Sequence, residues 1–269
     1  MKTSAILIGA LAALTALAAR AQPPAGSKYV AMGSSFAAGP GILPSADDPP
    51  NRCTRSRDNY AHQLARRRNL NLVDVSCSGA ATEHLLSPWN ELKPQLDAVD
   101  ADTRLVTVTI GGNDVRLTAR LGAGACHTAK ATPCADIPAP PTEAEWAGLE
   151  TRLTRIAQEV HRRAPNARLV FVDYTTVLPP QGTCPALSLT ADQAQSSRAI
   201  NARVVAVTAK VAKDTGSGLV TASTVTAAHN ACSAEPWANG YPPAKGAAFH
   251  PRLEAHTAIA EALDKLIWR

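Results

Sequence analysis

Aromatic residues are scarce in this chain of 269 residues, because phenylalanine, tryptophan and tyrosine together make up 4% of it. The apolar fraction is still an ordinary 45%, so a hydrophobic core must rest on alanine, valine, leucine and isoleucine. Beyond the amino terminus no apolar run approaches the ~20 residues that cross a bilayer, which disfavours a spanning helix. No internal repeat or composition break is present either, so one large domain is expected over residues 22–269.

A large excess of charge of one sign is also missing, since the formal net charge is +5. The basic residues are scattered, apart from the short run Arg66–Arg68. Such a run could bind nucleic acid or anionic lipid, but it fits the solvated carboxyl end of a helix better, where cations suit the helix dipole. We therefore expect no nucleic-acid partner.

The first 21 residues have the pattern of a secretory signal peptide. Lys2 gives a positive start, residues 5–19 are apolar and uncharged, and Ala19-Arg20-Ala21 fits the small-x-small cleavage pattern. A membrane anchor is the alternative, but the apolar run is shorter than a bilayer requires. Cleavage near Ala21 removes Lys2 and Arg20, so the mature charge is +5 − 2 = +3. A secreted or periplasmic protein without stable membrane insertion is expected.

The cysteines lack the spacing of a metal site, because no Cys-x-x-Cys pair occurs and the adjacent Cys126 and His127 are poorly placed to share one ion. An even number of cysteines behind a signal peptide instead predicts three disulfides, for which fifteen pairings exist. We expect the sequential pairing, in which each bridge closes one loop and contributes about 3–4 kcal/mol in the loop-entropy model. The predicted bridges are Cys53–Cys77, Cys126–Cys134 and Cys184–Cys232.

Short segments rich in β-branched residues alternate with helical patterns along the chain. The predicted strands are Lys28–Met32, Leu72–Ser76, Arg104–Ile110, Arg168–Tyr174 and Leu219–Ala222. The predicted helices are Asp58–Arg68, Thr142–Ala164, Thr190–Asp214 and Glu254–Arg269. Thr142 with Glu145 forms a capping-box pattern, and Thr190 or Asp192 opens the next long helix. This alternation predicts an α/β fold with a parallel sheet covered by helices on both faces.

Four segments with chemically useful side chains follow the predicted strands or precede the last helix. They are Gly33–Gly39 with Ser35, Cys77–Ala80 with Gly79, Gly111–Asp114 with Asn113, and Phe249–Pro251 with His250. Ligands of an open parallel sheet bind outside the carboxyl ends of its strands, so these segments should meet at one edge.

Acyl transfer requires an activated nucleophile, an oriented base and donors for the oxyanion. Ser35 lies on a glycine-flanked turn that would expose its hydroxyl, and His250 could take the hydroxyl proton. The Asn113 side chain and the backbone N–H groups of Gly79 and Ser35 could stabilise the oxyanion. Each such donor is typically worth about 10²–10³-fold in turnover.

Together these segments resemble the SGNH (GDSL-type) hydrolase family, and above all its secreted, three-disulfide esterase and lipase branch. The matching stretches occur in the family's order and are Tyr29–Gly39, Cys53–Ser56 with Tyr60, Cys77–Thr82, Val106–Asp114, and Phe249–Pro251 with His256. The resemblance implies a flavodoxin-like three-layer sandwich with a five-stranded parallel sheet. It also implies carboxylic ester hydrolysis with Ser35 as nucleophile, His250 as base, Gly79 and Asn113 in the oxyanion hole, and no cofactor.

Two positions depart from the family pattern. Ser34 stands where an aspartate usually precedes the nucleophile, and it is a rival nucleophile, although a neighbour of Ser35 on a tight turn should point elsewhere. Ala247 stands where an aspartate usually precedes the histidine by three residues. We therefore predict a Ser35–His250 dyad in which the carbonyl of Ala247 or of a neighbour accepts from the imidazole.

Other polar residues receive structural interpretations. Asp114 is expected to cap a helix rather than to act as a catalytic acid. His256 is expected to be a helix histidine or a neighbour of the site, and no context assigns a role to the remaining histidines: His62, His84, His127, His161 and His229.

Two alternatives remain open besides this esterase. An α/β-hydrolase is disfavoured because its Gly-x-Ser-x-Gly elbow is incomplete around Ser35. A secreted binding module that has lost activity is motivated by the changes at Ser34 and Ala247. Within the family, a lipase, a phospholipase or a carbohydrate acetylesterase would use the same chemistry on lipid or glycan esters. The chain lacks a large apolar lid stretch, so we expect a monomer that hydrolyses small, short-chain acyl esters with broad tolerance.

Overall fold

The computed structural model describes residues 22–268, so the predicted signal peptide lies outside the described residues. Its centre is a five-stranded, fully parallel sheet with the order β2-β1-β3-β4-β5. This is the flavodoxin-like order, with its switch point between β1 and β3. The strands are β1 (Lys28–Gly33), β2 (Asn71–Asp74), β3 (Thr103–Thr109), β4 (Arg168–Val172) and β5 (Gly218–Val220).

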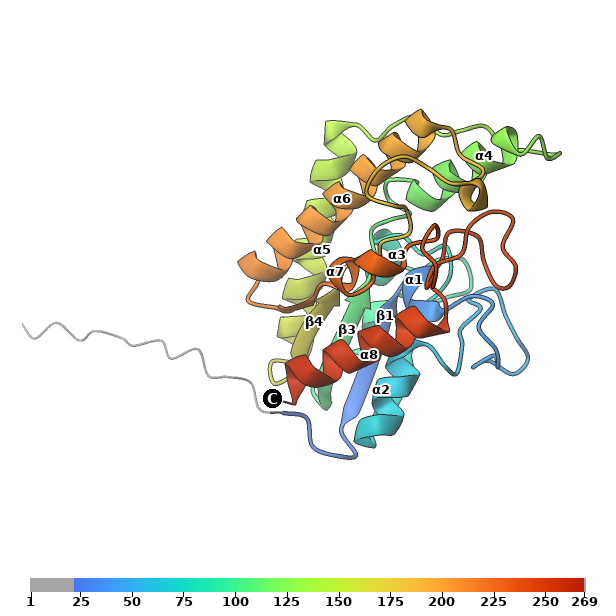
Figure 1. Ribbon diagram of the computed structural model, residues 1–269. Coiled ribbons are helices and arrows are strands. Elements are labelled where there is room, and N and C mark those ends of the chain that lie inside the picture. Colours follow the sequence, from blue (N-terminus) through green and yellow to red (C-terminus); the bar gives the residue numbers. More distant parts are fainter. Residues whose placement is uncertain (1–21, 269) are drawn as a thin grey trace, which may run out of the picture.

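Helices cover both faces of the sheet, which confirms the predicted three-layer α/β fold (Figure 1). One face is covered by α2 (Tyr60–Arg68) and α8 (Leu253–Ile267), and the other by α5 (Glu143–Arg163) and α6 (Ala191–Asp214). The remaining α-helices are α1 (Ser35–Ala38), α3 (Glu83–Leu86), α4 (Leu117–Thr128) and α7 (Ala222–Val225). Short 3₁₀ helices are η1 (Gln95–Ala98), η2 (Pro185–Leu187) and η3 (Ala227–His229). Within residues 22–268, no helix has the length and apolar character needed to cross a membrane.

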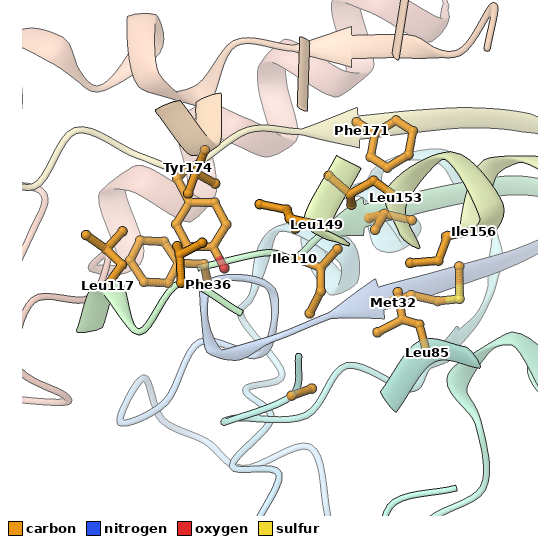
Figure 2. Packing of buried hydrophobic residues seen from close by; sticks show 14 of the residues in the cluster. Met32, Phe36, Leu85, Ile110, Leu117, Leu149, Leu153, Ile156, Phe171 and Tyr174 are labelled. Atoms are coloured by element: carbon orange, nitrogen blue, oxygen red, sulfur yellow. The ribbon is translucent and has the colours of Figure 1, made fainter. Parts of the chain in front are cut away.

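Side chains of each central strand alternate between two apolar clusters, one on each face of the sheet. In β1, Val30 and Met32 join the cluster under α5 and α6, while Tyr29 and Ala31 join the one under α2 and α8. The strand period of two therefore feeds both cores, as expected of a parallel sheet that is buried on both sides. Figure 2 shows how Leu, Ile, Met and a few aromatic side chains fill the α5–α6 side.

The long helices begin where the sequence predicts. Thr142 accepts from the Glu145 N–H and the Glu145 carboxylate accepts from the Thr142 N–H, which is a complete capping box. Thr190 makes the same box with Gln193 at the start of α6, so Thr190, not Asp192, is the cap. The basic run at Arg66–Arg68 occupies the last turn of α2, the helix-end position that the sequence favoured.

The predicted strands Leu72–Ser76 and Arg168–Tyr174 end two residues earlier in the structure, at Asp74 and Val172, and two further local predictions also differ. Ala222 was expected in the last strand, but β5 ends at Val220 and Ala222 begins α7. Helix α4 was not predicted, because Gly122 and Gly124 each lower helix propensity by about 1 kcal/mol relative to alanine. The three disulfides are Cys53–Cys77, Cys126–Cys134 and Cys184–Cys232, the sequential pairing expected from the sequence.

Candidate active site

Ser35 begins α1 directly after β1, at the carboxyl edge of the sheet. Its Oγ lies 2.7 Å from the Nε2 of His250, which is 215 residues away in the sequence. Gly33 precedes this turn with a φ of +148°, and a Cβ there would lie 2.4 Å from the Thr109 carbonyl oxygen. Only glycine therefore lets the chain pass from β1 into α1 against β3, which is how the backbone brings Ser35 to the edge.

The imidazole of His250 is oriented by a backbone carbonyl. Its Nδ1 lies 2.7 Å from the Ala248 oxygen, which can only accept, so Nδ1 carries the proton and Nε2 is left to accept from Ser35. The Ala247 carbonyl instead accepts from the Asn239 side chain at 3.0 Å. The sequence predicted the carbonyl of Ala247 or of a neighbour as acceptor for the His250 ring, and in the structure this acceptor is Ala248. Among the described residues no carboxylate hydrogen-bonds either ring nitrogen.

Burial lowers the pKa of His250 below its ordinary value of 6.5, an effect that the hydrogen bond to the Ala248 carbonyl partly opposes. The ring of Phe36 contributes to this burial, with its centroid 5.0 Å from that of His250. The imidazole is therefore neutral at neutral pH, as a general base must be.

Ser34 points away from His250 and is fully buried. Its Oγ lies 3.1 Å from the hydroxyl of Tyr174, which also accepts a 2.7 Å hydrogen bond from the Gly112 N–H. Burial raises the pKa of Tyr174 to about 12, so its hydroxyl stays protonated. This geometry removes Ser34 as a rival nucleophile. Sequence patterns gave no indication of Tyr174 as a partner, since it comes from the end of β4, 140 residues away.

Gly79 and Asn113 lie on adjacent loops that are hydrogen-bonded to each other. The Asn113 Nδ2 donates to the Ala80 carbonyl at 2.9 Å and uses one of its two protons. Gly79 has a φ of +85°, which turns the backbone after Cys77. Within residues 22–268, the backbone N–H groups of Ser35 and Gly79 have no hydrogen-bond acceptor in the protein. Two backbone donors and one side-chain proton thus remain for a ligand.

An ion pair between the buried Asp114 carboxylate and the partly exposed Arg152 joins these loops to α5. The Asp114 side chain is 2% exposed and accepts from the Thr82 N–H at 3.0 Å, from the Thr82 hydroxyl, and from Arg152 at 3.0 Å. Arg152 also donates to the Thr82 hydroxyl at 2.6 Å. The prediction that Asp114 caps a helix was wrong, because Arg116 occupies the start of α4 in a left-handed conformation and Asp114 turns to the Thr82 loop.

His256 is a buried residue of α8, in agreement with its structural assignment. Its Nδ1 accepts from the Tyr60 N–H at 3.2 Å, and burial lowers its pKa to about 3. It is therefore permanently neutral at physiological pH. His62 belongs to a different cluster, 3.6 Å from the Asp74 carboxylate.

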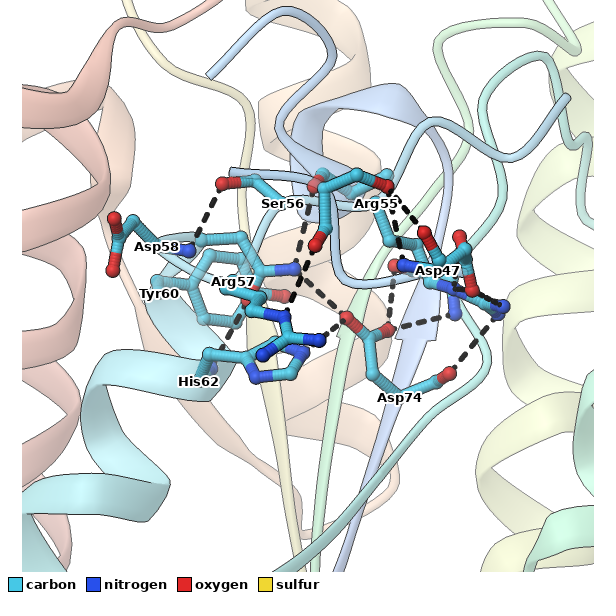
Figure 3. A network of polar contacts seen from close by, with 12 residues as sticks. Asp47, Arg55, Ser56, Arg57, Asp58, Tyr60, His62 and Asp74 are labelled. Atoms are coloured by element: carbon cyan, nitrogen blue, oxygen red, sulfur yellow. Dashed lines mark hydrogen bonds and ion pairs between the residues drawn. The ribbon is translucent and has the colours of Figure 1, made fainter. Parts of the chain in front are cut away.

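That cluster holds the segment 39–59, which follows the Ser35 turn (Figure 3). The Asp74 carboxylate accepts from the Asn59 side chain at 2.8 Å and from the Ser76 hydroxyl at 2.7 Å. Arg55 pairs with Asp47 and donates to the Asp74 carbonyl at 3.0 Å. The Cys53–Cys77 disulfide ties the same segment to the Gly79 loop. The segment that follows the Ser35 turn is thus anchored to β2 and to the Gly79 loop.

An apolar pocket of about 440 Å³ opens beside Phe36, the residue after Ser35. Its walls come from α4, α6 and the segment after β4, and they are formed by Leu117, Leu121, Val177, Leu178, Pro180 and Val205. Pockets of this size and character hold small organic ligands. In residues 22–268 no group of three His, Cys, Asp or Glu side chains is arranged to hold a metal ion.

Comparisons with known proteins agree with this architecture. Residues 31–258 match the model of the GDSL-like lipase/acylhydrolase family. The chain is 34% identical to "Lipase 2" of Streptomyces coelicolor, over 93% of this chain and 91% of that protein. It is 31% identical to a lipase of Streptomyces rimosus, over 91% of this chain and 86% of that protein.

Two solved structures share the fold. The crystal structure of the extracellular lipase from Streptomyces rimosus matches with a TM-score of 0.72 at 26% identity, covering 90% of this chain and all of that one. Phospholipase A1 from Streptomyces albidoflavus matches with a TM-score of 0.74 at 24% identity and the same coverage.

Proposed function

The chain belongs to the GDSL-like lipase/acylhydrolase family and is a carboxylic ester hydrolase, and we propose that it works through an acyl-enzyme on Ser35 with His250 as general base. One observation carries this proposal: the 2.7 Å contact between the Ser35 Oγ and the His250 Nε2, on a ring whose Nδ1 proton is held by Ala248. A neutral imidazole aimed at a hydroxyl is the arrangement that activates serine.

In the acylation half, the Ser35 oxygen bonds to the ester carbonyl carbon while its proton moves to the His250 Nε2. The resulting imidazolium is stabilised by the Ala248 carbonyl. The tetrahedral oxyanion would accept from the Ser35 and Gly79 N–H groups and from the remaining Asn113 proton. Collapse breaks the bond to the alkoxy group, which leaves with the proton from His250.

Deacylation repeats the sequence with water. His250 takes a proton from the water as its oxygen bonds to the acyl carbon, and the second tetrahedral species releases the acid while Ser35 regains its proton. No other acid or base is needed, so we propose a dyad in which the carbonyl of Ala248 replaces the usual aspartate.

The acyl part of the substrate is proposed to enter the apolar pocket beside Phe36. The absence of a large lid stretch favours small, short-chain esters, and a pocket of about 440 Å³ leaves room for longer chains. We therefore expect short-chain esters to react best, with broad tolerance. The lipase names of the relatives make longer acyl esters the alternative.

We also propose that the protein is secreted as one domain of residues 22–269 after removal of residues 1–21, and that it is a monomer. The three disulfides support an oxidising compartment, and a relative of the same fold is an extracellular lipase.

The test is hydrolysis of a nitrophenyl acyl series from acetyl to palmitoyl. We expect Ser35→Ala and His250→Gln each to lower kcat by at least about 10⁴-fold. Ser34→Ala is the matched control, because its hydroxyl faces Tyr174. It loosens the turn without removing the nucleophile, so it should lower kcat by about 100-fold at most, far less than Ser35→Ala. Full activity in Ser35→Ala would refute the nucleophile, and the best chain length would decide between esterase and lipase.

A binding module on the same fold remains the alternative, motivated by Ser34 and Ala247. An active-serine phosphonate separates the two, because it adds its mass to Ser35 only if that hydroxyl is activated. A folded, disulfide-intact wild type that neither reacts with the phosphonate nor hydrolyses any ester of the series would favour the binding module.

A further inference from the structure

Two of the large exposed apolar side chains lie together at one hollow of the surface. Leu43 is 80% exposed and Leu253 is 44% exposed, and both line one open hollow of about 620 Å³. The other two in the described residues, Val73 at 38% and Ile137 at 40%, line no part of it. Single exposed apolar residues are ordinary, but a shared apolar surface marks a contact site.

The hollow is formed where two loops touch. One loop contains the uninterrupted apolar stretch Pro40–Pro44, and the other contains Ala244–Gly246. A Cβ at Gly41 would lie 2.2 Å from the Gly246 Cα, so the two backbones are in direct contact. We call the side chains of Pro40, Ile42, Leu43 and Leu253 around this hollow the apolar rim.

The rim is connected directly to the reacting residues. Its first loop begins after Gly39, the residue that ends α1, and Leu253 follows His250 by three residues. The second loop runs into His250 and is held by the Asn239 side chain at the Ala247 carbonyl. A surface bound to the rim would therefore contact the loops that carry Ser35 and His250.

The charges at the hollow are predominantly positive. Lys245 and Arg252 line it, and neither makes an ion pair in residues 22–268. Glu254 is the one acidic lining residue, and it stands in the first turn of α8, where a carboxylate suits the helix dipole. Arg252 is held by the Asn239 side chain at 2.9 Å and by the Pro236 carbonyl at 3.2 Å, so Lys245 is the exposed cation at the hollow. Exposed apolar side chains beside such a cation fit the surface of an anionic lipid layer.

We propose that the apolar rim and Lys245 form a docking surface for an anionic lipid–water interface. Leu43 and Leu253 enter the acyl boundary, Lys245 contacts the lipid headgroups, and the protein attaches reversibly with Ser35 facing the layer. The relevance of this surface to ester substrates rests on the proposed function, whereas the binding itself does not.

Binding is measured with Ser35→Ala protein, so that hydrolysis cannot alter the lipid. Cosedimentation with vesicles of phosphatidylcholine containing phosphatidylglycerol should show a partition coefficient that falls about tenfold in Leu43→Ser/Leu253→Ser. Lys245→Gln should lower it by about fivefold on these vesicles and leave the weaker binding to pure phosphatidylcholine unchanged.

The matched control is Val73→Ser/Ile137→Ser, which removes the two other large exposed apolar side chains of the described residues and should bind as well as the parent. In the active background, the rim double variant should hydrolyse soluble nitrophenyl acetate normally and lose activity on phosphatidylglycerol vesicles. No vesicle binding by a protein active on nitrophenyl acetate would overturn the docking surface and leave the proposed function intact. Equal losses of vesicle binding in the two double variants would also overturn the docking surface. So would self-association of the parent protein that Leu43→Ser/Leu253→Ser abolishes.

Discussion

The hydroxyl of Tyr174 bridges Ser34 and Gly112, at 3.1 Å from the Ser34 Oγ and 2.7 Å from the Gly112 nitrogen. It therefore joins the turn that carries Ser35 to the loop that carries Asn113, across the carboxyl ends of β1 and β3. A Cβ at Gly112 would lie 2.5 Å from the Tyr174 ring, so the contact requires glycine. In this chain a tyrosine–serine contact occupies the place beside the nucleophile where the family usually has a carboxylate.

Tyr174→Phe should lower kcat with little change in KM. The variant leaves a buried N–H and a buried hydroxyl without a partner, which costs about 1–3 kcal/mol of unfolding free energy. A small displacement between Ser35 and Asn113 should reduce kcat by about 10- to 100-fold. Steady-state kinetics with a nitrophenyl ester and urea unfolding measure the two effects.

The matched control is Tyr29→Phe. The Tyr29 hydroxyl is equally buried and bonds Thr107 at 2.7 Å, but on the α2–α8 side of the sheet. The Tyr29→Phe variant should therefore have a lower free energy of unfolding and an unchanged kcat. Equal kcat in both variants would mean that Tyr174 acts on folding alone.

The ion pair of Asp114 with Arg152 should matter for turnover as well. Arg152→Met leaves the buried Asp114 carboxylate with Thr82 alone, which loosens the loops of Gly79 and Asn113. We expect a loss of about 1–3 kcal/mol in stability and a fall in kcat that exceeds any change in KM.

An exposed ion pair provides the comparison. Arg203 pairs with Glu143 at the surface, where ion pairs contribute about 0–1 kcal/mol. Arg203 also stacks on the Trp146 ring at 4.6 Å, so Arg203→Met should lower the urea midpoint slightly and leave kcat unchanged. If Arg152→Met behaves like Arg203→Met, the Asp114–Arg152 pair does not position the oxyanion donors.

The strands and the functional residues that follow them were predictable from the sequence. The distant side chains that hold the loops of the site were not. Val106 and Val108 alternate with threonines, and a parallel sheet brings strand ends together, so the contact between Ser35 and His250 and the position of Asn113 on a loop after β3 follow from local patterns. Tyr174 and Arg152 come from distant segments, and no local spacing marks them. The Ala248 carbonyl, two residues before His250, is instead one of the neighbours that the sequence allowed. Long-range packing selects Tyr174 and Arg152, which is also why Asp114 turned to Thr82 rather than to its own helix.

The pH dependence of kcat/KM should reflect His250. The base must be neutral, so activity rises as the pH increases through its pKa, and burial places that pKa below the ordinary 6.5. We expect the acid limb to have its midpoint below 6.5 and activity to stay level above it into the neutral range. A midpoint above 6.5 would instead indicate a carboxylate partner that stabilises the imidazolium, contrary to the dyad.

Asp173 should make stability fall as the pH rises from 4 to 6. Burial raises its pKa from 3.8 to about 6, although its carboxylate accepts from the Ser223 N–H at 2.7 Å and hydroxyl at 2.8 Å. Between pH 4 and 6 the Asp173 carboxyl is protonated in the folded protein but ionised in the unfolded chain. The free energy of unfolding therefore falls as the pH rises and the folded protein loses this proton.

Asp173→Asn removes this titration, so its unfolding free energy relative to wild type should increase between pH 4 and pH 7. A difference of about two pKa units sets an upper limit of about 3 kcal/mol. Glu145 should give a stability change of the opposite sign, because its hydrogen bonds with Arg116 lower its pKa to about 2. The unfolding free energy of Glu145→Gln relative to wild type should therefore decrease over the same rise in pH. Urea unfolding of the three proteins at both pH values measures these differences. Parallel curves for wild type and Asp173→Asn would show that Asp173 titrates alike in the folded and unfolded chains.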